Sequence, residues 1–199
     1  MSRRSIGCGV VVLLSTVACC AAQESRSEFS LQGNGLFTKS TSGSAYTYSP
    51  AETGGFLIAY RYRLRRGLSA EFVYGFNRDT QKYNYTGGVF GTQSNNHQTT
   101  AGLVEALPSF GRGRFSPYVL AGGGALIFSP RSHWLSGTET QAKPTFVYGG
   151  GVNYALSKRI SFRVEYRGLV YAAPNFGQNT LNTSITHSAL PSVGLAFHF

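Results

Sequence analysis

THSALPSVGLAFHF, residues 186–199, alternates apolar side chains with small or polar ones up to the last residue. Every second residue, counted back from the end, is apolar: Phe199, Phe197, Leu195, Val193, Pro191 and Ala189. The interleaved residues are small or polar, with Leu190 as the exception. This period of two predicts a strand with one apolar face and one face of small or polar side chains. A strand that continues to a terminal Phe is unusual in a soluble domain, where chain ends tend to fray.

The first 22 residues have the composition of a secretory signal peptide. Arg3 and Arg4 precede an apolar stretch at residues 6–18, which is shorter than the ~20 residues that a membrane-spanning helix needs. Small residues follow, and polar residues begin directly after Ala22, which predicts cleavage at that point. Two alternatives stay open: a buried N-terminal helix, and a lipoprotein acylated at Cys19. The predicted organisation is a signal peptide, 1–22, and one mature domain, 23–199.

The composition of the mature chain restricts its class. All three cysteines lie inside the leader, so residues 23–199 contain neither a disulfide nor a thiolate metal site. Removing Arg3 and Arg4 from the 18 basic residues leaves 16 against 8 acidic ones, and these basic residues are scattered. An exported chain of this kind is not expected to bind nucleic acid, and an anionic lipid surface suits its charge better. No apolar run after residue 22 approaches the length of a membrane helix, so only a closed barrel could cross a membrane.

Eight stretches of the mature chain show strand-like alternation. They cover residues 28–38, 53–64, 68–77, 96–110, 115–128, 143–156, 160–171 and 186–199. The polar connections alternate between long ones of 12 to 18 residues and short ones of three or four. The long connections include residues 39–50, 78–95, 129–142 and 172–185. This arrangement predicts an all-β fold, an eight-stranded antiparallel up-and-down barrel with short turns at one end and long loops at the other.

The combination of leader, strand count, loop alternation and terminal Phe resembles the OmpA-like family of bacterial outer-membrane β-barrels. The resemblance covers essentially the whole mature chain. It implies a transmembrane barrel in the bacterial outer membrane, with both termini on the periplasmic side. It also implies that the closing strand, through Leu195, Phe197 and Phe199, is the signal that the barrel-assembly machinery recognises. The implied partners are outer-membrane lipid and that machinery, without a cofactor, and the sequence names no partner for the loops.

The function expected from this reading is non-enzymatic, either envelope integrity or surface interaction through the long loops. A soluble, lipocalin-like ligand-binding barrel is the main alternative. In that fold the apolar face surrounds a ligand and the charged face meets water. Because both folds alternate, the pattern separates them only in part. The scarcity of Lys on the strands and the terminal Phe favour the membrane barrel, whose sheet must close because lipid offers no hydrogen bonds.

If the apolar face points outward, a set of charged side chains points into the lumen. The predicted set is Arg61, Arg63, Glu71, Glu105, Arg163, Glu165 and Arg167, and Glu28 shares its phase. Most of these residues lie close to a short turn, which places them in the periplasmic half. An eight-stranded barrel is just wide enough to be filled by side chains, so these arginines and glutamates should pair. We interpret the set as a structural plug, and a gate in a proton or small-ion path is the alternative.

No catalytic, cofactor-binding or metal site is predicted. His187 and Ser188 suggest the Ser/His pair of a barrel-borne lipid hydrolase, but adjacent residues on a strand point to opposite faces. A lipid-modifying outer-membrane enzyme is therefore the less favoured alternative. The glycine triplets at 122–124 and 149–151 are predicted to face each other across a hairpin, where missing side chains let the sheet bend.

Overall fold

The structure is a computed structural model that describes residues 26–39, 41–42, 47–50, 53–85, 88–111, 113–130, 140–174 and 184–199. The predicted signal peptide, its cleavage after Ala22 and the alternative acylation of Cys19 lie outside the described residues. Within the described part, no helix has the length and apolar character that crossing a membrane requires.

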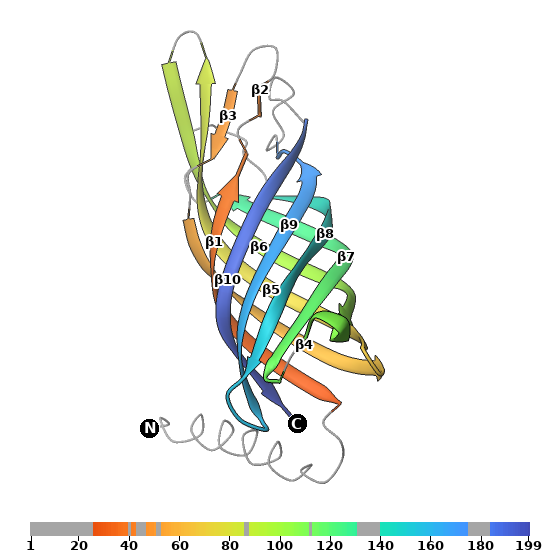
Figure 1. Cartoon of the computed structure of the whole chain (residues 1–199). Helices are drawn as coiled ribbons and strands as arrows, with labels where there is room; N and C mark the ends of the chain where they lie inside the picture. The colour runs from red at the N-terminus through yellow and green to blue at the C-terminus, as the bar shows by residue number, and fades with distance from the viewer. Residues whose placement is uncertain are drawn as a thin grey trace, which may run out of the picture.

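The described chain folds into a closed antiparallel barrel, which confirms the predicted fold class (Figure 1). Its wall consists of β1 (Ser27–Thr38), β4 (Thr53–Arg65), β5 (Leu68–Tyr85), β6 (Gly88–Ala106), β7 (Phe115–Pro130), β8 (Gln141–Ala155), β9 (Ile160–Ala172) and β10 (Ile185–His198). Each wall strand pairs with the next one along the chain, and β10 returns to pair with β1. Closure supplies every wall strand with a partner on both sides, which removes the free edges that lipid could not satisfy.

The closing strand is held up to its last residue. Phe29 lies opposite Phe197 in the β1–β10 ladder. The Phe199 amide donates to the Ser27 carbonyl at 2.9 Å, and the Ser27 amide donates to the Phe199 carbonyl at 3.1 Å. The chain end therefore forms part of the barrel wall, as the alternation in 186–199 predicts.

The predicted polar connections at 39–50 and 78–95 are wrong as loops, because parts of both form strands. β5 and β6 stay paired as far as Tyr85 and Gly88, whereas among the described residues β5 has no β4 partner beyond Asn77 and β6 has no β7 partner before Ser94. Two short strands, β2 (Thr41–Ser42) and β3 (Thr47–Pro50), pair with each other, and β3 also pairs with β5. Polar side chains do not prevent two strands from pairing, because the backbone groups of β5 and β6 form the hydrogen bonds of the ribbon. This β5–β6 ribbon rises beyond the wall at the end opposite the C-terminus (Figure 1).

Two further details differ from the sequence-based expectations. The stretch predicted at 96–110 ends as a strand at Ala106, and the 3-10 turn η2 (Pro108–Phe110) follows. The two glycine triplets do not face each other, because Gly122 lies opposite Val147 and Gly149 lies opposite Leu120. Register depends on turn geometry and on matching faces, and composition alone does not specify it.

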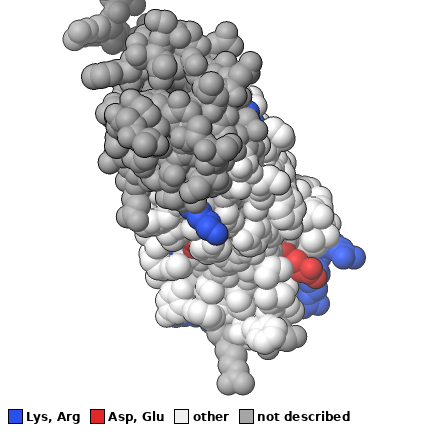
Figure 2. All heavy atoms as spheres, turned by 90° about the horizontal axis from the view of Figure 1, so that it is seen from above, with Lys and Arg blue, Asp and Glu red and all other residues white. Residues whose placement is uncertain are grey.

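The outward positions of the wall are apolar and exposed. On β10 and β9, Val193 is 52% exposed and Val164 is 48% exposed, while their chain neighbours Ser192, Arg163 and Glu165 are buried. Most of the described surface in Figure 2 is formed by uncharged residues. The same alternation buries Ser, Asn, Gln, Arg and Glu side chains inside the barrel. This is the reverse of a lipocalin-like barrel, and it matches a wall that faces lipid.

Candidate functional site

The lumen is the part of the barrel in which charged side chains gather. Five of the seven charged residues predicted there have buried side chains and form ion pairs: Arg61 on β4, Glu71 on β5, and Arg163, Glu165 and Arg167 on β9. Glu28 on β1 joins them by pairing with Arg163. These six residues form what we call the charged layer.

Two ion pairs of the charged layer cross the lumen. Strands β5 and β9 lie four places apart around the barrel in either direction, so they face each other. Arg167 on β9 donates from Nη2 to Glu71 Oε1 on β5 at 2.6 Å, and from Nε to Glu165 Oε1 at 2.5 Å. Arg61 on β4 also pairs with Glu71, and it donates from Nη2 to Glu165 Oε2 at 2.9 Å. The network therefore ties opposite walls together, and each carboxylate has two arginine partners.

Glu28 and Arg163 form the edge of the charged layer that lies nearest the C-terminus. Arg163, which is 0% exposed, donates through Nη2 to Glu28, through Nε to Asn153 Oδ1 at 2.8 Å, and through Nη1 to Ser30 Oγ at 3.2 Å. All three nitrogens of this buried guanidinium are satisfied, which is the condition under which a buried charge is tolerated.

Tyr118 on β7 is a central member of this site that sequence reasoning missed. Its hydroxyl donates to Glu165 Oε2 at 2.5 Å, and the Arg61 guanidinium carbon lies 4.2 Å from the centre of its ring. Gly151 lies opposite Tyr118 on β8, and a Cβ added there would come within 2.6 Å of the Tyr118 hydroxyl oxygen. The second glycine triplet thus leaves room for the tyrosine. The glycines at 122–124 leave the phase of this stretch ambiguous in the sequence, which is why Tyr118 was not assigned to the lumen.

Two predicted lumen residues do not belong to the network. Glu105 is exposed and lies opposite Val119, an outward residue that is 43% exposed, whereas its neighbour Val104 is buried. The prediction for Glu105 is wrong because the face of β6 that we read as outward, including Thr100 and Val104, points inward. Arg63 is exposed near the end of β4, and it forms no ion pair with any described residue.

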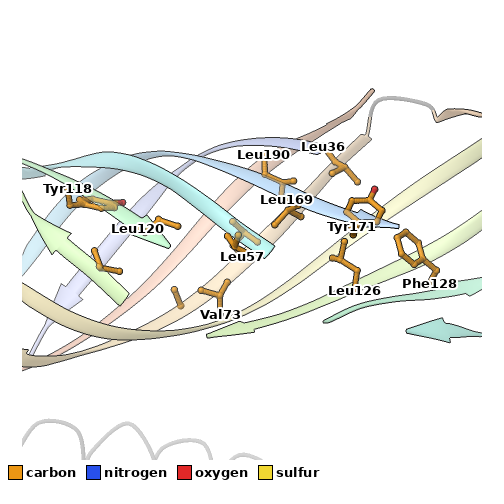
Figure 3. Packing of buried hydrophobic residues seen from close by; sticks show 13 residues of the cluster. Leu36, Leu57, Val73, Tyr118, Leu120, Leu126, Phe128, Leu169, Tyr171 and Leu190 are labelled. Atoms are coloured by element: carbon orange, nitrogen blue, oxygen red, sulfur yellow. The ribbon is translucent and has the colours of Figure 1, made fainter. Parts of the chain in front are cut away.

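Above the charged layer, away from the termini, the lumen contains an apolar layer (Figure 3). Leucines and valines from different strands contact one another there, including Leu57, Val73, Val147, Leu169 and Leu190. Leu57 and Leu190 are 0% exposed. Two cavities beside the layers have volumes of about 10 Å³ each, which is at the lower limit for holding one water molecule. Side chains therefore fill this section of the lumen.

The histidine and serine pair suggested by the sequence is separated by the wall. Ser188 is buried inside and bonds to the Tyr171 hydroxyl at 2.8 Å, whereas His187 bonds to the Tyr148 hydroxyl outside at 3.0 Å. The opposite-face argument for this pair agrees with the structure. Among the described residues, no group of three or more His, Cys, Asp or Glu side chains could hold a metal ion.

A different serine and histidine do meet at the mouth of the lumen beside the C-terminus. Ser161 Oγ lies 2.8 Å from His198 Nε2, and His198 Nδ1 lies 3.5 Å from Glu28 Oε2. The order of groups is that of a hydrolase triad, but the second distance exceeds that of a hydrogen bond. The Glu28 carboxylate is instead directed to Arg163. The local pattern around residues 28, 161 and 198 contains no sequence signal for this meeting, because the three residues lie on three different strands.

The chain is similar to known outer-membrane barrels. The family model described as outer membrane protein beta-barrel domain matches residues 9–190. Among solved structures, the chain resembles neisserial surface protein A, with 17% identity over 86% of this chain and 97% of that one and a TM-score of 0.58. It also resembles OprG from Pseudomonas aeruginosa (12% identity, 88% and 97%, TM-score 0.60) and Ail of Yersinia pestis (16% identity, 89% and 100%, TM-score 0.55). At these identities the solved structures show the fold alone. No curated protein matches the chain.

Proposed function

The chain belongs to the outer membrane protein β-barrel domain family, and from this premise we propose that it is a non-enzymatic barrel with a plugged lumen. Its location is the outer membrane, and its apolar wall contacts lipid. In this proposal the protein serves envelope integrity or surface interaction, through its wall and its extracellular strands.

The filled lumen is the observation that carries the proposal. A water-filled path would have to pass both the charged layer, where Arg167 bridges opposite walls, and the apolar layer around Leu57. Satisfied ion pairs leave no free charge to attract ions, and an apolar constriction disfavours water. Passage of solutes is therefore not the role that this geometry supports.

The β5–β6 ribbon supports a role outside the membrane. In barrels of this family the short turns face the periplasm, so the end opposite the C-terminus is extracellular. Residues 78–85 and 88–93 stay paired beyond the wall over six to eight residues per strand, a reach of ~20–26 Å at ~3.3 Å per residue. The segment is rich in Thr, Gly and Gln, which suits contact with polar surfaces.

Two measurements test the proposal. In planar bilayers, the refolded protein should show no steady conductance, and regular open-channel currents would contradict the plug. In cells, a variant in which Asn-Gly replaces residues 78–93 should still fold, with a heat-modifiable gel band. If cells with this variant survive detergent as well as cells with the parent protein but no longer adhere to surfaces, the ribbon carries surface interaction. If detergent survival falls only when the whole gene is removed, the wall serves envelope integrity.

A lipid- or ester-hydrolysing enzyme is the second candidate, and the Ser161–His198 contact of 2.8 Å is the observation that favours it. A fluorophosphonate probe should label Ser161 if its hydroxyl is activated, and a Ser161→Ala variant should remove the label. We expect no labelling, because Glu28 is held by Arg163 and does not orient the histidine. Mass spectrometry of lipid A with and without expression gives an independent check.

We also propose that export and assembly use the two ends of the chain. Cleavage after Ala22 predicts a mature protein that begins at Gln23, which intact mass spectrometry can check. Leu195, Phe197 and Phe199 point outward and are 39–40% exposed, so their side chains are accessible to the barrel-assembly machinery. Replacing Phe199 by Ala should lower the amount inserted into the outer membrane, whereas Phe110→Ala, at a turn, should leave it unchanged.

A further inference from the structure

The periplasmic mouth of the lumen contains a cavity of about 390 Å³ that the plug does not fill. Its floor includes Arg61 and Tyr118 of the site described above, and its rim includes Arg26, Arg63 and Arg66. We call this cavity the vestibule. Its volume lies near the lower end of the range for small-molecule sites, and it corresponds to the space of roughly a dozen waters.

Three arginines at the rim have no counter-ion in the part of the chain that the structure describes. Arg26, Arg63 and Arg66 are exposed, and none of them forms an ion pair with a described residue. The Arg63 amide donates to the Arg26 carbonyl at 2.8 Å, which brings two of these cations to adjacent strand ends. Like charges held close together repel each other, and an anion placed between them would relieve that repulsion.

The floor of the vestibule adds donors and no free negative charge. Among the described residues that line the cavity, Glu28 is the acidic one, and its carboxylate pairs with Arg163 of the charged layer. Arg61 uses Nε and Nη2 for Glu71 and Glu165, and its Nη1 has no hydrogen-bond partner among the described residues. Ser69 and Ser116, which carry hydroxyl groups, also line the cavity. Donors therefore surround the space from the rim and the floor.

We infer that the vestibule binds a phosphate group presented from the periplasmic side. Planar guanidinium groups bind phosphate oxygens in pairs, and several arginines arranged around one cavity suit a group with three or more charged oxygens. The group has two sources: a soluble phosphate compound, or the headgroup of an anionic phospholipid in the inner leaflet beside the rim. Their shared chemistry is what the vestibule recognises. This inference concerns the mouth of the barrel and does not depend on the role of the extracellular ribbon.

The test uses the refolded mature protein, residues 23–199, in nanodiscs of phosphatidylcholine. Sodium tripolyphosphate is titrated into these nanodiscs, and calorimetry measures its binding. The rim double variant Arg63→Gln with Arg66→Gln should bind at least tenfold more weakly than the parent. The matched control is Arg65→Gln with Arg159→Gln, which removes the same charge at exposed positions outside the lining, one at the end of β4 and one in the bend before β9. The control should change the affinity by less than twofold.

A second measurement identifies the source of the phosphate. The parent, the rim double variant and the control are each placed in nanodiscs that contain phosphatidylglycerol and are then purified from them. Native mass spectrometry measures how much lipid each protein retains. Lipid retained by the parent and the control, but lost from the rim double variant, assigns the site to a headgroup. Tripolyphosphate binding without lipid retention assigns it to a soluble phosphate. Equal weakening in both double variants, or no binding of either probe to the parent, would overturn the inference.

Discussion

The charged layer and the apolar layer fill the same lumen by different means. In the charged layer, Arg167 must reach Glu71 on the opposite wall, so both the identity and the position of each group matter. In the apolar layer, Leu57 and Leu190 contact neighbours without directional bonds, so volume is what matters. The comparison teaches that one layer specifies which walls face each other, while the other mainly excludes water. Substitutions in the two layers should therefore differ in kind.

The largest effect is expected from Glu165→Gln in the charged layer. The change removes a carboxylate charge that Arg61 and Arg167 share, and it leaves both cations underpaired in a buried site. Breaking a buried ion pair from one side costs ~3–5 kcal/mol. The free energy of unfolding, measured by urea titration in lipid vesicles, should fall by that amount. Glu105→Gln on the outer face is the matched control and should have little effect. Equal losses of stability in the two variants would contradict the assignment of Glu165 to the lumen and Glu105 to the outer face.

Leu57→Ala is the corresponding test of the apolar layer. Leu57 is 0% exposed, and truncating such a side chain leaves a cavity that costs about 3 kcal/mol within a range of ~2–5 kcal/mol. Leu57→Met keeps the volume and should cost less than ~1.5 kcal/mol. The same urea titration measures both variants. If Leu57→Met proved as damaging as Leu57→Ala, the apolar layer would depend on shape as strictly as the charged layer depends on charge.

Val164→Lys compares the lumen with the lipid face on a single strand. Val164 lies between the buried Arg163 and Glu165 and is 48% exposed on the outside. A Lys facing lipid costs ~2–4 kcal/mol at the midplane and less toward the interface, so we expect a loss of about 2 kcal/mol. The temperature at which the folded gel band disappears should fall. Val164→Leu is the control, and a lysine variant as stable as the leucine variant would show that this face does not meet lipid.

The smallest effect is expected from Tyr118→Phe, which keeps the ring beside Arg61 and removes the bond to Glu165. Hydrogen bonds to charged groups contribute ~1.5–3 kcal/mol, and we expect a loss of about 1.5 kcal/mol. Tyr154→Phe, on the exposed outer face, should change the stability little. In the background of Glu165→Gln, the Tyr118 effect should shrink, because its acceptor has lost its charge. Full additivity in this double-mutant cycle would show that the two side chains are not coupled.

Much of the barrel could be predicted because alternation is a local property. The pattern of Thr186 to Phe199 indicates a strand, its apolar face and its continuation to the chain end, and the same reasoning finds the other seven wall strands. On β9 the alternation of Arg163, Glu165 and Arg167 with apolar residues also assigns the inner face correctly. The polar ribbon at 78–93 escaped prediction because its pairing comes from backbone bonds, which leave no apolar period in the sequence.

The sequence by itself determined the strands, the closed sheet they require and the apolar belt, because each follows from side chains two residues apart. Only the tertiary structure decided which residues meet across the lumen. Arg167 finds Glu71 because β9 and β5 stand opposite each other, and Glu105 lies on the outer face because the face of β6 that includes Thr100 and Val104 points inward. Tyr118 reaches Glu165 because the β7–β8 register places Gly151 beside it. Register and closure bring together residues 47 to 104 positions apart in the chain, as in the Tyr118–Glu165 and Arg61–Glu165 contacts, and no local period records such distances.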